Sequence, residues 1–377
     1  MTTLPHTDPL PLAQHLIRCA SITPADEGAQ TVLTTELKKL GFTVTKLRFG
    51  AIDNLFARIG EGGPHFCFAG HTDVVPAGGG AWTAQPFGGD VRAGLLYGRG
   101  AVDMKGAIAA FVAGAAQHLQ TVKLRGSISL LITGDEEADA VDGTVRVLDW
   151  MAAHGQIPDF CLVGEPTSQA RLGDVIKIGR RGSVTARIVV HGTQGHVAYP
   201  SRTDNPIHRL VRALGALMAA PLDGGSEWFE PSTLQVTSFD VGNPASNVVP
   251  AQARAVLNIR FNDRHSSASL GSWLRATLSR YCDRFDLDLQ VSGESFLTEP
   301  GAQVETLRRA IAEASGIEPR LDTGGGTSDA RFISRFCPVA EFGLIGTTMH
   351  QVDERVPVDE LRALANIYGH VLKAVGV

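Results

Sequence analysis

Cysteine is scarce and scattered in this chain of 377 residues. The cysteines are odd in number and no two form a Cys-x-x-Cys pair, so we expect neither a disulfide framework nor a thiolate metal cage. They are Cys19, Cys67, Cys161, Cys282 and Cys337. The chain also lacks any run of about 18 uncharged apolar residues, and its first residues show no basic segment followed by an apolar one. Together these absences favour a cytoplasmic protein.

Positive charge is not in excess either. The formal net charge is −5, from 34 Lys and Arg against 39 Asp and Glu, so the sequence gives no reason to expect a nucleic-acid or membrane partner. At 44% hydrophobic and 19% charged residues, the chain has enough apolar side chains for a sizeable core. Its length suits two domains.

Strand-like and helix-like segments alternate along both ends of the chain, which indicates an α/β fold. We expect helices at 10–19, 27–40, 104–119 and 357–373, and strands at 54–59, 65–69, 127–132 and 160–163. From about residue 182 the order becomes strand–helix–strand–strand–helix–strand, over 184–190, 205–219, 233–240, 253–261, 267–282 and 287–291. We therefore predict a mixed-sheet domain with helices on both faces, formed by 1–181 and 295–377. A smaller α+β, ferredoxin-like domain at 182–294 is inserted into it.

Acidic and imidazole side chains stand where the predicted strands end. These residues are His71 and Asp73, Glu136 and Glu137, Glu165, Asp103 at a loop-to-helix junction, and His350. In an α/β sheet, sites form outside the carboxyl ends of the strands. Each residue alone has a plainer interpretation, such as a helix N-cap for Asp103 or a solvated acidic turn for 135–137. Their combination predicts one metal centre.

The kinds of side chain in this set indicate which metals they would bind. Imidazole and carboxylate without thiolate suit zinc, cobalt or manganese. One carboxylate has two oxygens and can bridge two cations. Three carboxylates and a bridging hydroxide together carry about four negative charges, which two divalent ions neutralise and one does not.

The same segments resemble the M20 metallopeptidase-like family in order and spacing over essentially the whole chain. The matching motifs are Gly70 to Pro76, Gly98 to Gly106, Gly134 to Glu137, Gly164 to Pro166, and Met349-His350. The resemblance implies an amide hydrolase with two zinc ions, with cobalt possible in one site. His71 and Glu165 would hold one ion and Glu137 and His350 the other, with Asp103 bridging both.

The resemblance also implies roles for three further residues. Glu136 would be the general base that takes a proton from water and returns it to the leaving amine. Asp73 would orient the ring of His71 from behind. His196 would reach the active site of the other subunit and help bind the oxyanion, so that a homodimer is part of the machinery.

Further segments resemble those family members that hydrolyse N-succinyl-LL-2,6-diaminopimelate to succinate and LL-2,6-diaminopimelate, a step in lysine and diaminopimelate biosynthesis. These segments are Gly179 to Ser183, His196 to Pro200, Asn247 to Pro250 and Gly325 to Phe332. This small-molecule substrate carries carboxylates at both ends, which guanidinium and hydroxyl donors bind well. The implied substrate contacts are Arg180, Ser183, Tyr199, Asn247, Arg260, Gly326 and Thr327.

Some expectations depart from this pattern or stay open. Arg181 and Lys177 are expected to be surface residues. Some relatives carry Asn where this chain has Gly346, so a contact is absent there or comes from Thr347 or Thr348.

A related amide hydrolase, such as an acetylornithine deacetylase or an aminoacylase, would share the metal ligands and differ in specificity residues. A non-enzymatic binding protein on the same fold would lack ligands or the base, and this chain has them all.

Overall fold

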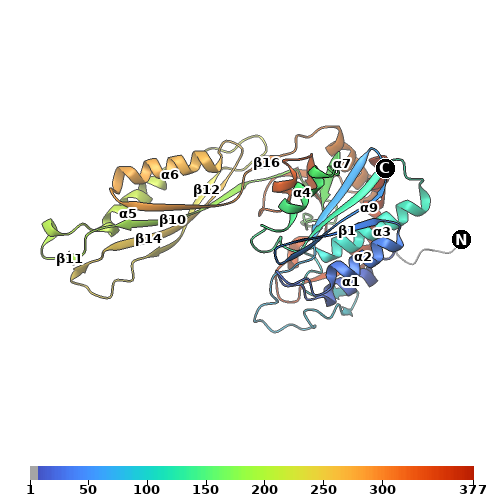
Figure 1. Ribbon diagram of the computed structural model, residues 1–377, viewed down its shortest axis with the longest axis horizontal. Coiled ribbons are helices and arrows are strands. Elements are labelled where there is room, and N and C mark those ends of the chain that lie inside the picture. The colour runs from blue at the N-terminus through green and yellow to red at the C-terminus, as the bar shows by residue number, and fades with distance from the viewer. Residues whose placement is uncertain (1–6) are drawn as a thin grey trace. The chain divides into compact units, whose positions relative to one another are not determined.

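The computed structural model describes residues 7–377 and divides into two compact units (Figure 1). The first unit holds the described chain up to Ile178, together with Thr298–Asp322 and Ser328–Val377. The second holds Gly179–Leu297 and Thr323–Thr327. Within residues 7–377, no helix is both long and apolar enough to span a membrane.

An eight-stranded mixed sheet forms the centre of the first unit, with the strand order β1-β2-β6-β3-β7-β18-β8-β17. Its strands are β1 (Thr43–Phe49), β2 (Ile52–Gly60), β3 (His65–His71), β6 (Ser127–Thr133), β7 (Phe160–Val163), β8 (Val175–Lys177), β17 (Arg320–Asp322) and β18 (Val339–Glu341). Strands β6, β3, β7 and β18 run parallel to one another, whereas β1 pairs antiparallel with β2, β2 with β6, and β18 with β8. Every residue of β3 and β6 is buried, so both faces of the sheet centre are covered. The predicted α/β fold with a mixed sheet is confirmed.

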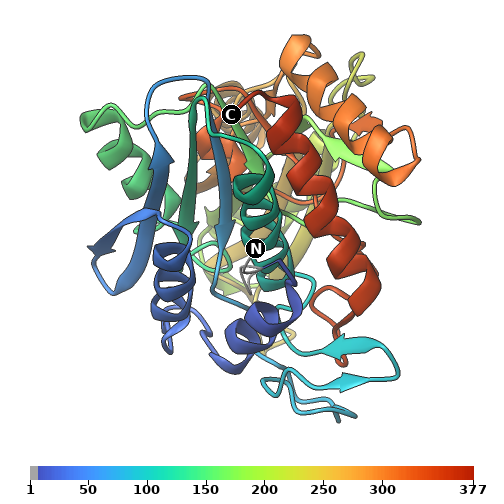
Figure 2. The same cartoon turned by 90° about the vertical axis from the view of Figure 1, so that its right-hand side faces the viewer.

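Helices complete the first unit. They are α1 (Leu10–Arg18), α2 (Ala29–Lys39), α3 (Lys105–Thr121), α4 (Thr144–Ala153), α7 (Ala302–Ser315), α8 (Ala330–Ile333) and α9 (Val358–Ala374). Figure 2 shows α3 and α9 side by side, and the two helices pack together. A Cβ on Gly114 would lie 2.6 Å from the carbonyl oxygen of Ala365, so this close approach requires a residue without a side chain. Phe111 of α3 stacks on Phe68 of β3 at 4.2 Å between ring centroids, which fixes the helix on the sheet.

The first unit also contains a small three-stranded sheet, made of β4 (Val91–Arg92), β5 (Leu95–Tyr97) and β19 (Arg355–Pro357). These short strands were not predicted from the sequence. Neither was β1, whose run Thr-Val-Thr-Lys-Leu-Arg-Phe is only partly buried at the sheet edge. An edge strand with one solvated face carries a weak apolar signal.

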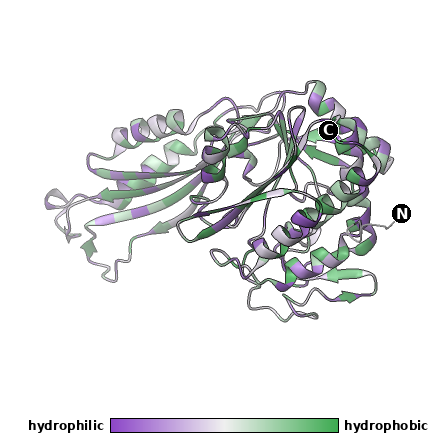
Figure 3. Cartoon of the chain, turned by 45° about the vertical axis from the view of Figure 1, so that its right-hand side comes forward, coloured by the Kyte–Doolittle hydropathy of each residue, from purple (hydrophilic) through white to green (hydrophobic). Residues whose placement is uncertain are grey.

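The second unit has the predicted strand–helix–strand–strand–helix–strand order. Its elements are β10 (Gly182–His191), α5 (Pro206–Leu217), β12 (Thr233–Asp240), β14 (Gln252–Phe261), α6 (Ser267–Tyr281) and β15 (Phe285–Gly293). The strands form an antiparallel sheet in the order β12-β14-β10-β15. Alternate strand residues, such as Val184 and Leu257, join Leu210 and Leu274 of the helices in one apolar core. Figure 3 shows the same contrast as green and purple residues alternating along these elements.

Two small ladders extend the second unit: β9 (Gly179–Arg180) with β16 (Phe296–Leu297), and β11 (Gly195–His196) with β13 (Val248–Val249). The unit also includes Thr323–Thr327, which the sequence analysis assigned to the flanking part of the chain. Arg180 Nη1 donates to the carbonyl oxygen of Gly326 at 3.1 Å, and the Thr323 hydroxyl donates to that of Trp228. These hydrogen bonds hold the glycine-rich loop on the second unit.

Candidate metal centre

Three neighbouring parallel strands of the first unit deliver candidate ligands to one edge of the sheet. His71 is the last residue of β3, Glu136 and Glu137 follow the end of β6, and Glu165 follows the end of β7. Since β6, β3 and β7 are adjacent and parallel, their carboxyl ends meet. The strand pattern in the sequence therefore accounts for the convergence of these side chains.

Two further candidates come from loops. Asp103 lies just before α3, and His350 follows a 3-10 turn at Gly346–Thr348. His350 has φ of 60°, in the left-handed region that a residue with a side chain rarely adopts. Such backbone strain costs on the order of 1–3 kcal/mol and persists where surrounding contacts hold it, often at functional sites.

The carboxylate of Asp103 lies between the two imidazoles. Its Oδ1 is 3.2 Å from His71 Nε2, and its Oδ2 is 3.2 Å from His350 Nε2. Glu165 Oε1 lies 3.8 Å from His71 Nε2, and Glu137 Oε1 lies 3.0 Å from His350 Nε2. The five residues thus form two groups that share one aspartate, each with its ligand atoms within 4.8 Å of one another.

This donor set fits a pair of zinc ions. Two atoms that each lie about 2.0–2.1 Å from one tetrahedral zinc are about 3.4 Å apart, and the distances from Asp103 to the two rings are close to that value. Imidazole and carboxylate oxygen are ligands that zinc accepts. A third cluster, His71 with Glu136 and Glu137, also brings its ligand atoms within 4.8 Å, so Glu136 stands beside both groups.

The titration of the candidate ligands reflects their mutual contacts. Burial alone would lower the pKa of His71, but the hydrogen bond with Asp103 and the charge of Glu136 hold that pKa well above its ordinary range. Hydrogen bonds with Asp103 and Glu137 raise the pKa of His350 to about 10. Burial opposes ionisation of Asp103, yet the two imidazoles hold its pKa below the usual range. A divalent cation would take the place of the protons that these rings carry.

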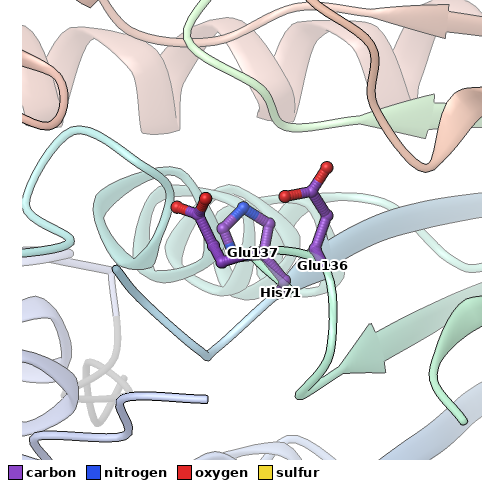
Figure 4. Close-up of side chains that lie close together, drawn as sticks. All are labelled: His71, Glu136 and Glu137. Atoms are coloured by element: carbon purple, nitrogen blue, oxygen red, sulfur yellow. The ribbon is translucent and has the colours of Figure 1, made fainter. Parts of the chain in front are cut away.

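Glu136 is the sequence neighbour of the candidate ligand Glu137, and its carboxyl group lies on the other side of the His71 ring (Figure 4). Figure 4 shows the carboxyl groups of Glu136 and Glu137 on either side of the His71 ring, all three pointing to the same side of the loop. Burial and the neighbouring charge of Glu165 raise the pKa of Glu136 well above its ordinary range. A carboxylate with a raised pKa holds a proton more readily, which suits a general base that must later return it.

The carboxylate of Asp73 supports the loop of Glu136 and Glu137, and its backbone carbonyl contacts the ring of His71. The ring of His71 donates from Nδ1 to the backbone carbonyl of Asp73 at 3.0 Å, while the carboxylate Oδ1 is 3.6 Å away. The carboxylate accepts hydrogen bonds from the backbone N–H groups of Glu136 at 3.3 Å and Glu137 at 3.0 Å. It therefore contacts the backbone of the candidate base and of a candidate ligand as well as lying behind His71.

Sequence reasoning missed Thr23, whose hydroxyl donates to Asp73 Oδ2 at 2.7 Å. The two residues are 50 positions apart, and a threonine in a loop carries no pattern that marks such a contact. Ser21 in the same segment donates to the carbonyl of Thr72 at 2.6 Å. Residues of the segment after α1 thus brace the loop that follows β3.

Three of the predicted site residues gather at one end of the second unit. His196 pairs with Val248 across the β11–β13 ladder, and the N–H of Val197 donates to the carbonyl of Asn247 at 3.0 Å. The rings of His196 and Tyr199 lie 5.7 Å apart, and both side chains are exposed. His196, Tyr199 and Asn247 therefore form one polar, accessible group.

The other predicted substrate contacts belong to a second group in the same unit. Ser183 of β10 and Arg260 of β14 are cross-strand partners. Arg180 reaches the loop that contains Gly326 and Thr327. Burial and the nearby charge of Arg181 lower the pKa of Arg260, an effect that an anionic ligand would relieve.

One expectation about nearby side chains is wrong. Lys177 was expected at the surface, but it is buried and paired with the carboxylate of Asp322, because β8 and β17 place the two residues side by side. Arg181 is only partly exposed, 3.7 Å from the Glu230 carboxylate.

The loop before His350 lacks a side chain at Gly346. A Cβ there would lie 3.1 Å from the carbonyl oxygen of Pro166, a tight contact next to Glu165. The Thr348 hydroxyl is engaged with the backbone of Arg355, whereas Thr347 is exposed. Of the two threonines, Thr347 is thus the one whose hydroxyl could replace a missing contact.

The chain is similar to proteins of known family along almost its whole length. Residues 67–374 match the model of peptidase family M20/M25/M40. A protein of Acidiphilium cryptum named succinyl-diaminopimelate desuccinylase is 62% identical over 98% of both chains. A protein of the same name from Gluconacetobacter diazotrophicus is 60% identical over 97% of both.

Solved structures share the fold at much lower identity. An M20 family metallo-carboxypeptidase from Sulfolobus solfataricus superposes with a TM-score of 0.78 at 17% identity, covering 98% of this chain and 99% of the other. A dinuclear metal-binding peptidase of the M20 family from Bacillus subtilis gives a TM-score of 0.75 at 15% identity, with 99% of each chain covered. The match to the family model, the curated relatives and the arrangement of the candidate ligands agree: this chain belongs to peptidase family M20/M25/M40.

Proposed function

We propose that this chain is a metal-dependent amide hydrolase that converts N-succinyl-LL-2,6-diaminopimelate and water into succinate and LL-2,6-diaminopimelate. The observation that carries the hydrolase proposal is the Asp103 carboxylate, whose two oxygens each lie 3.2 Å from a different imidazole. The substrate follows from the relatives at 54–62% identity, which are named succinyl-diaminopimelate desuccinylase. The five free cysteines support a cytoplasmic location for this reaction.

In this proposal, the first unit holds the metals. His71 and Glu165 would hold one ion, His350 and Glu137 the other, and Asp103 both. When bound, two zinc ions, or zinc with Co²⁺ in one position, would supply Lewis acidity toward water and the amide carbonyl.

Glu136 provides the proton transfer. Its carboxylate accepts a proton from the attacking water and gives it to the departing amine nitrogen, so that the amide C–N bond breaks and a new C–O bond forms. Asp73 keeps the loop of Glu136 in place through the backbone N–H bond. The raised pKa of Glu136 supports this role.

The second unit would bind the ends of the substrate. Arg180 and Arg260 offer guanidinium groups to its carboxylates, and Ser183, Thr327 and the backbone at Gly326 lie in the same region of the unit. His196, with Tyr199 and Asn247 beside it, would act in the site of a partner subunit, which makes a homodimer part of the proposal. The exposure of His196 on a short ladder supports this role.

The test is metal analysis of the purified protein coupled to the release of succinate. We expect about two zinc ions per chain and rapid hydrolysis of N-succinyl-LL-2,6-diaminopimelate. N-acetylornithine, assayed side by side, should be a poor substrate. Faster release of acetate than of succinate would replace this proposal with an acetylornithine deacetylase, and a protein without metal-dependent amide hydrolysis would overturn it.

A further inference from the structure

A buried ion pair lies in the first unit, outside the candidate ligands. Arg99 Nη1 is 2.7 Å from Glu354 Oε2, and the two residues are 2% and 0% exposed. Burying two charges is expensive, and an apolar pair of similar size often stabilises a fold as well or better. The pair therefore calls for an explanation other than stability.

The second oxygen of Glu354 is directed at the residue that would bridge the metals. Glu354 Oε1 accepts hydrogen bonds from the backbone N–H groups of Val102 at 2.9 Å and Asp103 at 3.2 Å. One planar carboxylate thus binds the backbone of Asp103 on one side and a guanidinium on the other. Its orientation fixes where the Asp103 backbone lies.

The guanidinium of Arg99 binds the backbone of the loop that contains His350. It donates from Nη2 to the carbonyl of His350 at 3.4 Å and from Nη1 to that of Gln351 at 3.2 Å. It also donates to the carbonyl of Pro76, in the loop after His71, at 3.3 Å. These bonds surround the residue whose backbone is held at φ of 60°.

We propose that Arg99 and Glu354 are positioning residues that set the spacing between Asp103 and His350, and thereby form the metal position of Asp103, Glu137 and His350. This inference rests on the proposed two-metal hydrolase. The other position depends less on the pair, because His71 ends a central strand and Glu165 follows another. The pair joins loops about 250 residues apart in sequence, which no local contact could align.

The experiment titrates the metal-free full-length protein with Co²⁺ and follows visible absorption and heat. Wild type should bind two ions. In Glu354→Gln the amide NH₂ opposes the Arg99 donors, and in Arg99→Lys the ammonium cannot reach all the carbonyls that the guanidinium bridges. For both variants we expect one ion to bind as in wild type and the second at least about tenfold more weakly.

The control is Asp322→Asn, which breaks the partly buried pair with Lys177 in the same unit; the ion partners of Asp322 are Lys177 and Arg320, and neither is a candidate ligand. It should lower thermal stability and still bind two ions with wild-type affinity. Should Glu354→Gln fail to fold, Arg99→Lys, which keeps the charge pair, decides the matter. Two ions bound within twofold of wild-type affinity in the folded variants would overturn the inference, as would a wild type that binds fewer than two. A wild type that binds two ions without releasing succinate would refute the proposed function and leave this inference standing.

Discussion

Replacing Asp73 by Asn should slow hydrolysis while leaving both metals bound. Three donors converge on the Asp73 carboxylate: the Thr23 hydroxyl and the backbone N–H groups of Glu136 and Glu137. An asparagine has one acceptor oxygen. If that oxygen keeps the bonds with Thr23 and Glu137, the amide NH₂ faces the N–H of Glu136, and the general base loses its anchor.

The expected size of the effect follows from this lost bond. A hydrogen bond to a charged acceptor contributes about 1.5–3 kcal/mol, and about 1.4 kcal/mol corresponds to a tenfold rate change. If the loss acts mainly on the placement of Glu136, kcat should fall roughly 10- to 100-fold. KM should change little, because the proposed substrate contacts lie on the second unit.

The assay is steady-state release of succinate, with the metal content of each preparation measured in parallel. Thr23→Val is the graded control: it removes one donor and keeps the carboxylate, so we expect a loss of only about 2- to 10-fold. A kcat for Asp73→Asn within twofold of wild type, with two metals bound, would refute the reasoning. If Asp73→Asn instead loses one metal, and the molecules that keep both metals have an unchanged kcat, then the role of Asp73 is to orient His71.

Three further outcomes are expected. Glu136→Gln should keep two metals and lose about 10²- to 10⁴-fold in kcat; a near-normal kcat would exclude Glu136 as the base. Mixing His196→Ala chains with Glu136→Gln chains should restore part of the activity in mixed dimers, and no recovery would count against a shared site. Metal binding at pH 7 should release protons, because His350 in the metal-free protein has a pKa of about 10 against an ordinary 6.5. The protonated ring stabilises the folded, metal-free protein; this stabilisation is complete below pH 6.5 and is lost as pH rises through about 10. Protons therefore compete less with the metal over that window, and the apparent metal affinity should rise. An affinity independent of pH would contradict this.

Much of the fold was predictable because its signals are local. Buried strands such as β3 and β6 are continuous apolar runs, and the helix–strand order of the second unit follows from hydrophobic periodicity. The short strands β4, β5 and β19 and the edge strand β1 escaped prediction, since their residues are polar or too few. Lys177 was misplaced because a charged side chain is ordinarily exposed, and its partner Asp322 is 145 positions away.

In the candidate site, too, some features could be predicted from the sequence and others could not. The convergence of His71, Glu137 and Glu165 could be predicted, because these candidate ligands stand at or just after the ends of strands whose carboxyl ends must meet. The supports of the site could not. Thr23 contacts Asp73 across 50 residues, and Arg99 contacts Glu354 across 255; neither pair shares a periodic pattern or a strand end.

The amino-acid sequence by itself determined which donor groups are available and the order in which strands carry them to the sheet edge, because hydrophobic periodicity specifies strands and parallel strands share their ends. Only the tertiary structure decided how each donor is aimed. That Oδ1 of Asp103 faces His71 and Oδ2 faces His350 depends on side-chain torsions and on backbone contacts between distant loops. Such contacts form only once the chain has packed, and no local pattern of residues encodes them.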